Sequence, residues 1–267
     1  MSLFLTIASP IVVHAQAKPP QSATTTEPPA VLVIGREEVK PGKAAAHAQW
    51  EAGWPSAFAK VNYPTHYIAM TSMAGPNEAW YLTGYPSWDA MEKDNMRIDA
   101  DSALSAEMRR LSTGDGDFLS NISSMVAVNI PALNYGGPVD IGKMHYFEVL
   151  TFRMRPGHAA DFAKIATMYK NAYTKAKIDR PWAAYTVASG APGGTFLILL
   201  PMRSLGIMDS NMKNDAAVRE ALGADMAAAD KMVADGVISS TSQIMQFSPK
   251  MSYVSAAMKA SDPSFCK

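Results

Sequence analysis

The sequence of 267 residues predicts an α+β fold made of two β-α-β-β-α-β units, one in each half of the chain. Two observations carry this prediction. A strand, a Pro-Gly turn and an amphipathic helix occupy residues 144–173, and an earlier copy of the same three elements occupies residues 31–58. The elements that follow also come in the same order in both copies. The repeat is far longer than the repeats of solenoid proteins, so each copy is expected to be a whole domain.

The two copies stay in register along their length. Pro41 and Pro156, each followed by glycine in its turn, are 115 residues apart, whereas Tyr135 and Tyr253 are 118 residues apart. The offset therefore drifts by only three residues between the first pair and the last. The predicted domains are residues 31–135 and residues 144–254.

Composition and charge exclude several classes of partner. Apolar residues make up 48% of the chain and charged residues 18%, which is an ordinary globular composition. With 24 acidic and 24 basic residues, the chain has no net field that would attract nucleic acid or an anionic membrane. The only cysteine, Cys266, cannot form an internal disulfide, and no zinc cluster is indicated.

The N-terminal residues 1–17 have a short apolar core and end in Ala15-Gln16-Ala17, a pattern that signal peptidase accepts. They predict a signal peptide, a mature chain beginning near Lys18, and export to the periplasm or the medium. The alternative is a disordered apolar tail, and the lack of Lys or Arg before the apolar core leaves an upstream start codon open. This stretch is too short to span a membrane. Residues 18–30, rich in Pro and Thr, predict a flexible leader, and residues 255–267 a C-terminal tail.

In the first unit, residues 31–39 predict a buried strand, and the Pro-Gly turn leads into a helix. His47, Trp50, Trp54 and Phe58 share one face of that helix. Gly53 and Pro55 predict a kink or break near Trp54.

The remaining elements follow from hairpin turns and helical periodicity. In the first half we expect strands at residues 66–73 and 79–85, a helical region at 87–111 and a final strand at 125–130. In the second half the corresponding ranges are 183–188, 195–200, 204–234 and 243–247.

The order β-α-β-β-α-β is that of the ferredoxin-like unit, an antiparallel sheet with helices on one face. Two such sheets in one chain are expected to cover each other's bare faces and form a barrel-like sandwich with the helices outside. Over residues 31–254 the chain resembles the dimeric α+β barrel superfamily, which includes antibiotic-biosynthesis-type monooxygenases and NIPSNAP-like proteins, here as a tandem pseudo-dimer. Whether such chains assemble into a homo-oligomer stays open.

Residues 85–91, Tyr85-Pro86-Ser87-Trp88-Asp89-Ala90-Met91, resemble a strand-to-helix junction of the monooxygenase-type members. Those members commonly carry a histidine further along this helix. Residues 92–97 contain none, and Ser204 stands at the Trp88 position in the second half.

Two histidines of the first half occupy positions where the second half has aromatic residues: His47 matches Phe162, and His66 matches Trp182. A histidine on an apolar face is commonly a core residue satisfied by one hydrogen bond. The alternative is a polar-lined pocket that the second half has filled with aromatics. The ligand-binding residues expected under that alternative are His47, Trp50, Trp54, His66, Trp80 and Tyr85.

No catalytic signature accompanies this pocket. Alternation along the strand places His145 and Glu148 on opposite faces, which argues against an acid–base pair. Some members of the superfamily bind haem through a histidine, but no histidine here lies in a haem motif, and the methionines are not clustered as copper binding requires.

The sequence therefore predicts neither a cofactor nor a metal. Its main prediction is an exported protein that binds a small apolar or aromatic molecule without catalysis. The alternative is a cofactor-independent monooxygenase or isomerase.

Overall fold

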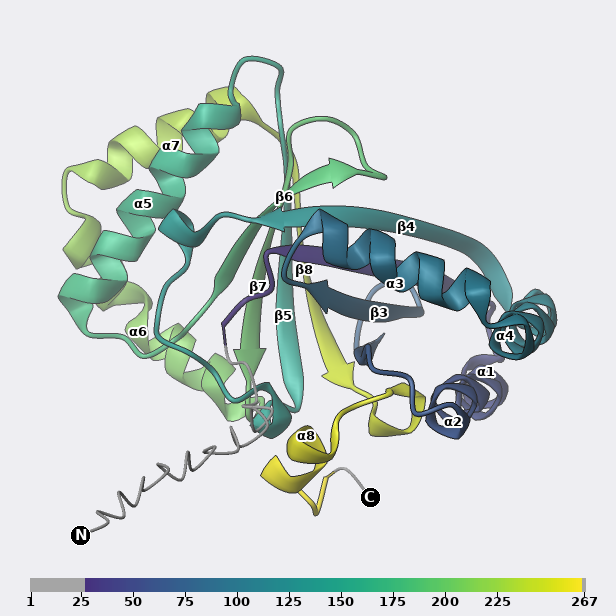
Figure 1. The fold of residues 1–267 in the computed structure, drawn as a ribbon. Coiled ribbons are helices and arrows are strands. Elements are labelled where there is room, and N and C mark those ends of the chain that lie inside the picture. Colours follow the sequence, from purple (N-terminus) through teal and green to yellow (C-terminus); the bar gives the residue numbers. More distant parts are fainter. Residues whose placement is uncertain (1–26, 266–267) are drawn as a thin grey trace, which may run out of the picture.

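The computed structural model describes residues 27–265 and shows an eight-stranded antiparallel barrel between two groups of helices (Figure 1). The predicted signal peptide, most of the leader and Cys266 lie outside the described residues. Within them, no helix has the length and apolar character needed to cross a membrane.

The first half contributes four strands and four helices. In chain order they are β1 (Val31–Val39), α1 (Ala44–Glu51), α2 (Gly53–Lys60), β2 (Tyr67–Ser72), β3 (Glu78–Tyr85), α3 (Trp88–Ala100), α4 (Ser102–Asp115) and β4 (Leu119–Asn129). Two short 3-10 helices, η1 (Pro131–Leu133) and η2 (Ile141–Lys143), lie in the connection to the second half.

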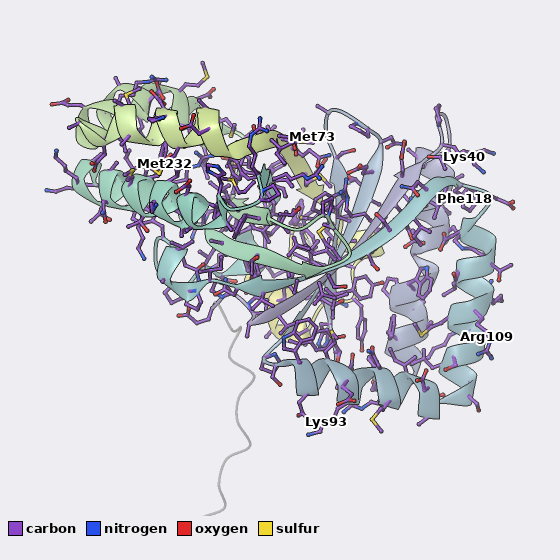
Figure 2. The ribbon with its side chains drawn as sticks, turned by 90° about the horizontal axis from the view of Figure 1, so that it is seen from above. Lys40, Met73, Lys93, Arg109, Phe118 and Met232 are labelled. Carbon is purple, nitrogen blue, oxygen red and sulfur yellow. The ribbon has the colours of Figure 1, made fainter. Side chains whose placement is uncertain are left out.

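The second half contributes four more strands. Its elements are β5 (Tyr146–Met154), α5 (Ala159–Ala176), β6 (Ala183–Ser189), β7 (Thr195–Met202), α6 (Gly206–Leu222), α7 (Asp225–Gly236), β8 (Val237–Phe247), η3 (Pro249–Met251) and α8 (Ala256–Ser261). Helix α8 lies in the segment predicted as a tail. Helices α1–α4 and α5–α7 lie on opposite sides of the barrel in Figure 1, and Figure 2 shows the same separation from above.

The strands are arranged around the barrel in the order β1-β3-β2-β8-β5-β7-β6-β4. Two pairings join the halves: β2 pairs with β8, where Met70 lies opposite Phe247, and β4 pairs with β6, where Val128 lies opposite Thr186. The edges of the two four-stranded sheets are therefore hydrogen-bonded to each other. This closure removes the unpaired strand edges that two stacked sheets would leave exposed.

The barrel interior holds the main apolar core, with side chains from both halves. Ile34, Met70, Val149, Leu197 and Met245 are completely buried there. Smaller apolar clusters lie between the barrel and the helices on each side. Each sheet is therefore covered on both faces, by the opposite half inside the barrel and by its own helices outside.

The last strand of each half is longer than the sequence predicted. Strand β4 begins at Leu119 rather than at residue 125, and β8 begins at Val237 rather than at residue 243. Both added segments are rich in serine and mostly exposed, so they lack the apolar alternation used to recognise a strand. Pairing with β1 and β5 along their length holds them in the barrel.

The helix break predicted near Trp54 is confirmed. Helix α1 ends at Glu51 and α2 begins at Gly53. A Cβ atom at Gly53 would lie 2.7 Å from Cδ2 of Leu111 on α4, so any larger residue would require the Leu111 side chain to shift. The matching helix of the second half, α5, is continuous from Ala159 to Ala176.

Gly190, after β6, is expected to be essential for closing the barrel beside β4. Its φ of +86° disfavours other residues, and a Cβ atom there would lie 2.1 Å from the Ser124 carbonyl oxygen. Gly190→Ala should lower the free energy of unfolding by more than about 2 kcal/mol in denaturant titrations. Gly75→Ala is the matched control, since Gly75 has a φ of +83° but nothing near its Cβ position. Equal losses in both variants would contradict the steric explanation.

Candidate functional site

The two halves place different residues at corresponding positions between their helices and the barrel. Glu37 of β1 lies opposite Ala79 and Ile122, and Phe152 of β5 lies opposite Phe196 and Ser240. Each partner in the second half comes 115 to 118 residues after its counterpart. The strand registers therefore allow residue-by-residue comparison of the two positions.

In the first half this position holds four buried titratable residues, which we call the polar cluster: Glu37, His47, Glu51 and Asp115. Glu37 comes from β1, His47 and Glu51 are one turn apart on α1, and Asp115 is the last residue of α4. Their exposed fractions are 8%, 2%, 2% and 3%. Nε2 of His47 lies 2.9 Å from Oε2 of Glu37. One ligand atom each from Glu37, His47 and Glu51 lies within 4.8 Å of the others.

Burial and mutual repulsion dominate the electrostatics of the polar cluster. Burial, followed by the negative charge of Glu37, raises the pKa of Glu51 to about 9. Burial also raises the pKa of Asp115. Trp54 Nε1 donates a hydrogen bond of 3.0 Å to Glu51. No lysine or arginine forms an ion pair with any cluster residue among residues 27–265.

Three buried polar atoms in and beside the cluster form no hydrogen bond of good geometry: the hydroxyls of Tyr67 and Tyr81, and Oδ1 of Asp115. In the described part of the chain only one other buried side-chain atom, Nε of Arg36, is in this state. The Tyr81 hydroxyl nonetheless lies close to the carboxyl groups of Glu51 and Glu37. Burial, with the charges of Glu51 and Glu37, raises the pKa of both tyrosines. Buried polar groups without a partner are uncommon, and their gathering at one place indicates a site for a bound species.

At the corresponding position of the second half lies a cavity of about 280 Å³, which we call the apolar cavity. Its lining residues are Leu150, Phe152, Met154, Phe162, Ile165, Ala166, Tyr169, Tyr173, Arg180, Trp182, Ile198, Leu200, Val233 and Val237. Phe152, Phe162, Ala166 and Val233 are the counterparts of the four residues of the polar cluster. An apolar chamber thus occupies the place that buried charges occupy in the first half.

Arg180 is the only charged residue in the lining of the apolar cavity. Its guanidinium group donates to Oε2 of Glu148, and Oε1 of the same carboxylate accepts a hydrogen bond of 2.9 Å from Ser242. A longer contact of 3.5 Å joins Arg180 to the Tyr173 hydroxyl. The cavity therefore has an aromatic body with one polar end.

The expectation that aromatic residues fill the second half's site is wrong, because they line a cavity there. The rings of Phe162 and Phe196 stack with their centroids 4.1 Å apart, and the Trp182 indole is tied to the Leu133 carbonyl oxygen by a bond of 2.8 Å. These contacts hold the rings against the barrel wall. Ala166, where the first half has Glu51, leaves part of the space open.

The six residues predicted to bind a ligand lie in several places. His47 belongs to the polar cluster, and Trp54 donates a hydrogen bond to Glu51 of the same cluster. Trp50 lies nearby, with its Nε1 donating to the Leu111 carbonyl oxygen at 3.0 Å and its ring 6.2 Å from that of Phe118. Phe118, labelled in Figure 2, lies where α4 leads into β4.

The other three residues are separated from His47. Trp80 points into the barrel, where it donates to Glu78 at 2.7 Å. Tyr85 donates to the buried Asp94 at 3.0 Å. His66 stacks on Tyr253 and lines a larger cavity of about 400 Å³, where the barrel interior meets the connection between the halves and α8. The structure does not bring the six together in one pocket, and their binding role stays a prediction.

Several functional candidates were missed by the sequence. Glu51 carried a usable signal, since it follows His47 by four residues and so shares its helix face. Glu37, Tyr81 and Asp115 carried none, because their meeting depends on strand register and on the approach of α4. Asp94 accepts hydrogen bonds from Tyr63, Thr65, Tyr85 and Arg97, and nothing in the sequence of the predicted helical region 87–111 distinguishes it.

No protein-family model matches the chain, and no curated protein matches it. Solved structures do resemble it. A predicted monooxygenase from Fusobacterium nucleatum is 12% identical with a TM-score of 0.54, covering 82% of this chain and 93% of that one. An anthrone oxidase-like protein is 12% identical with a TM-score of 0.52, covering 84% and 93%. The chain has the dimeric α+β barrel fold.

A third solved structure extends this likeness over more of the α+β barrel fold. A mutant chlorite dismutase from Candidatus Nitrospira defluvii is 9% identical with a TM-score of 0.51, covering 91% of this chain and 99% of that one. At such low identities the comparison establishes the fold of this chain and leaves its chemistry to its own residues.

Proposed function

We propose that this α+β barrel protein is an enzyme that acts on a small aromatic substrate bound in the apolar cavity of the second half. The observation that carries the proposal is the combination of a chamber of about 280 Å³, walls of aromatic and aliphatic side chains, and a single arginine at one end. Ligand sites are typically of this kind, mainly apolar with a few polar groups that orient the ligand.

The residues of the apolar cavity suit a cofactor-independent monooxygenase or isomerase. Tyr169 and Tyr173 offer hydroxyls, and the Arg180 guanidinium would stabilise negative charge on a substrate oxygen after proton loss. In an oxygenase reaction of this type, dioxygen accepts electrons from a substrate CH₂ group. One oxygen atom becomes the new carbonyl oxygen, and the other leaves as water. The anthrone oxidase-like protein of the same fold suggests an aromatic ketone as the first compound to test.

The second candidate function is binding without turnover. It is favoured by the contact between Arg180 and Glu148, since a guanidinium already paired with a carboxylate is less available to an anionic intermediate. No histidine or carboxylate lines the apolar cavity to act as a general base. Under this candidate the protein holds its aromatic ligand and releases it unchanged.

We also infer that the two halves are copies of one ferredoxin-like unit joined in tandem. Support comes from the strand registers and from the paired bridges Tyr135–Trp182 and Tyr67–Tyr253, each of which joins a residue after the last strand of one half to the opposite half. The behaviour of isolated halves, considered below, tests this inference.

The experiment for the proposed function combines ligand binding with oxygen consumption. Anthrone is titrated into the full chain while tryptophan fluorescence is recorded, and dioxygen uptake is then followed with an oxygen electrode. We expect saturable binding and uptake of one dioxygen per product. Ala166→Leu adds three carbons inside the cavity and should weaken binding at least about 10-fold. The added carbons occupy space that the ligand would fill, and each ligand methylene kept out of the cavity loses about 0.8 kcal/mol of burial.

Ala160→Leu is the matched control, because it makes the same change on the exposed side of α5 and should leave binding unaltered. Binding without oxygen uptake or conversion of the ligand would select the non-catalytic candidate. Equal weakening by both variants, or no binding of anthrone or related aromatic ketones to the native chain, would reject the cavity as the site.

A further inference from the structure

We propose that the polar cluster of the first half is a metal site, in which Glu37, His47 and Glu51 bind a divalent transition-metal ion with Asp115 as a fourth ligand. This site is distinct from the apolar cavity, and its existence does not depend on the proposed function. It also differs from the sequence-based expectation that no metal is bound.

The donor atoms already converge. Ligand atoms of Glu37, His47 and Glu51 lie within 4.8 Å of one another, and those of His47 and Glu37 are 2.9 Å apart. Nitrogen and oxygen ligands of an ion such as zinc lie about 2.0–2.2 Å from it, so two ligands on one ion are about 3–4 Å apart. Small side-chain rotations therefore suffice to place all three around one ion. They come from adjacent β1 and α1, which fixes their backbones relative to each other.

The charge of the polar cluster calls for a cation. Three carboxyl groups and one histidine are buried together, and among the described residues no lysine or arginine pairs with them. Buried charges in proteins are normally paired or coordinate a metal. In the metal-free chain the alternative is for carboxyl groups to hold protons, and a divalent ion would replace those protons while keeping the burial.

Unpartnered polar atoms provide the second, independent observation. Asp115 is 3% exposed, its Oδ1 has no hydrogen-bond partner, and it belongs to the last turn of α4 beside Glu51. The Tyr67 hydroxyl is also buried without a partner, and the Tyr81 hydroxyl lies close to Glu51 and Glu37 without a hydrogen bond of good geometry. These hydroxyls could donate to metal-bound carboxylates or to a water on the ion, and metal sites commonly have such an outer layer of hydrogen bonds. Trp54 already donates to Glu51 in that manner.

The donor set selects a class of ion. One imidazole with carboxylates suits Mn²⁺, Fe²⁺, Co²⁺ or Zn²⁺, whereas Ca²⁺ and Mg²⁺ prefer oxygen alone and Cu⁺ prefers sulfur. The second half provides an internal comparison, since Phe152, Phe162, Ala166 and Val233 stand at the matching positions and none of them can bind a metal. We therefore expect one ion per chain, and only in the first half.

The test uses the full chain after removal of any affinity tag. The protein is stripped with EDTA and dialysed, and Co²⁺ or Zn²⁺ is added while calorimetry and visible absorption are recorded. We expect one ion per chain by elemental analysis, d–d bands of Co²⁺ bound by nitrogen and oxygen, and a melting temperature that rises with metal. The conservative variants Glu37→Gln and Glu51→Gln should each weaken binding at least about 10-fold, as even outer-layer changes do at such sites.

Asp262→Asn is the control. Asp262 and His145 lie far apart in sequence and form a partly buried histidine–carboxylate contact of 2.8 Å outside the polar cluster. This variant should leave metal affinity unchanged. The proposal is overturned if the native, folded chain takes up no ion by elemental analysis and Co²⁺ absorption, or if the two cluster variants bind as tightly as the native chain. Neither readout requires enzymatic activity, and metal uptake by the native chain does not depend on the folding of any variant. Circular dichroism of the two cluster variants checks that they are folded before their binding is compared.

Discussion

Neither half of the chain, produced alone, is expected to remain a folded monomer. Residues 31–135 contain β1–β4, whose outer edges pair with β6 and β8 of the other half. The barrel-facing side chains of these strands, including Ile34, Met70 and Trp80, would also be exposed to water. Roughly 300 Å² of newly bare apolar surface corresponds to about 7 kcal/mol at about 25 cal/mol per Å², which is comparable to the whole stability of a small domain.

Analytical ultracentrifugation of the isolated first half measures this expectation. If the halves are copies of one unit, the fragment should form a dimer whose two sheets close a barrel, or else aggregate. Co-expression of residues 31–135 with residues 136–267 is the control and should restore a soluble one-to-one complex. A well-folded monomer of either fragment would contradict the dependence of each half on the other.

His47→Phe is expected to lower the free energy of unfolding by about 3 kcal/mol in the EDTA-treated protein. His47 is 2% exposed and forms the only side-chain hydrogen bond that Glu37 has among the described residues. Its loss leaves a buried carboxyl group without a partner, which costs about 1–3 kcal/mol for a neutral group and more for a charged one. Urea unfolding followed by circular dichroism measures the difference.

The matched comparison changes the whole polar cluster at once. Glu37→Phe, His47→Phe, Glu51→Ala and Asp115→Val together install the residues that the second half has at the same positions. Replacing all the buried polar groups together leaves none of them unpaired, so the fourfold variant should recover part of what His47→Phe loses. If His47→Phe leaves the free energy of unfolding unchanged, or if the fourfold variant is less stable than His47→Phe, the cluster does not act as one unit.

Local sequence patterns were enough to predict most of the fold. The Pro-Gly turns, the hairpin turn around Gly75 and the apolar alternation of residues 31–39 each depend on neighbouring residues, and the structure places strands and helices there. Closure of the barrel was harder to predict from the sequence, since the pairing of β2 with β8 joins residues far apart in the chain. The serine-rich beginnings of β4 and β8 are held by their neighbours rather than by burial, so their own composition gave no signal.

The candidate site was predicted only around His47. Its mismatch with Phe162 marked the position correctly as one where the halves differ. The aromatic residues expected to surround it were chosen by type, and type does not reveal which face of a strand a side chain occupies. Trp80 lies inside the barrel, whereas its neighbour Tyr81 lies on the helix side next to the polar cluster. Because successive side chains of a strand point to opposite faces, a shift of one residue decides whether an aromatic ring lies inside the barrel or beside the polar cluster.

The connection through η1 and η2 makes both sides of the barrel parts of one polypeptide. In a barrel assembled from two identical chains, a codon change alters both symmetry-related positions together, so a carboxylate gained on one side appears on the other. Here Glu37 and Phe152, or His47 and Phe162, are encoded separately. Selection can therefore act on each side alone, and a buried polar cluster on one side of the barrel can coexist with an apolar cavity on the other.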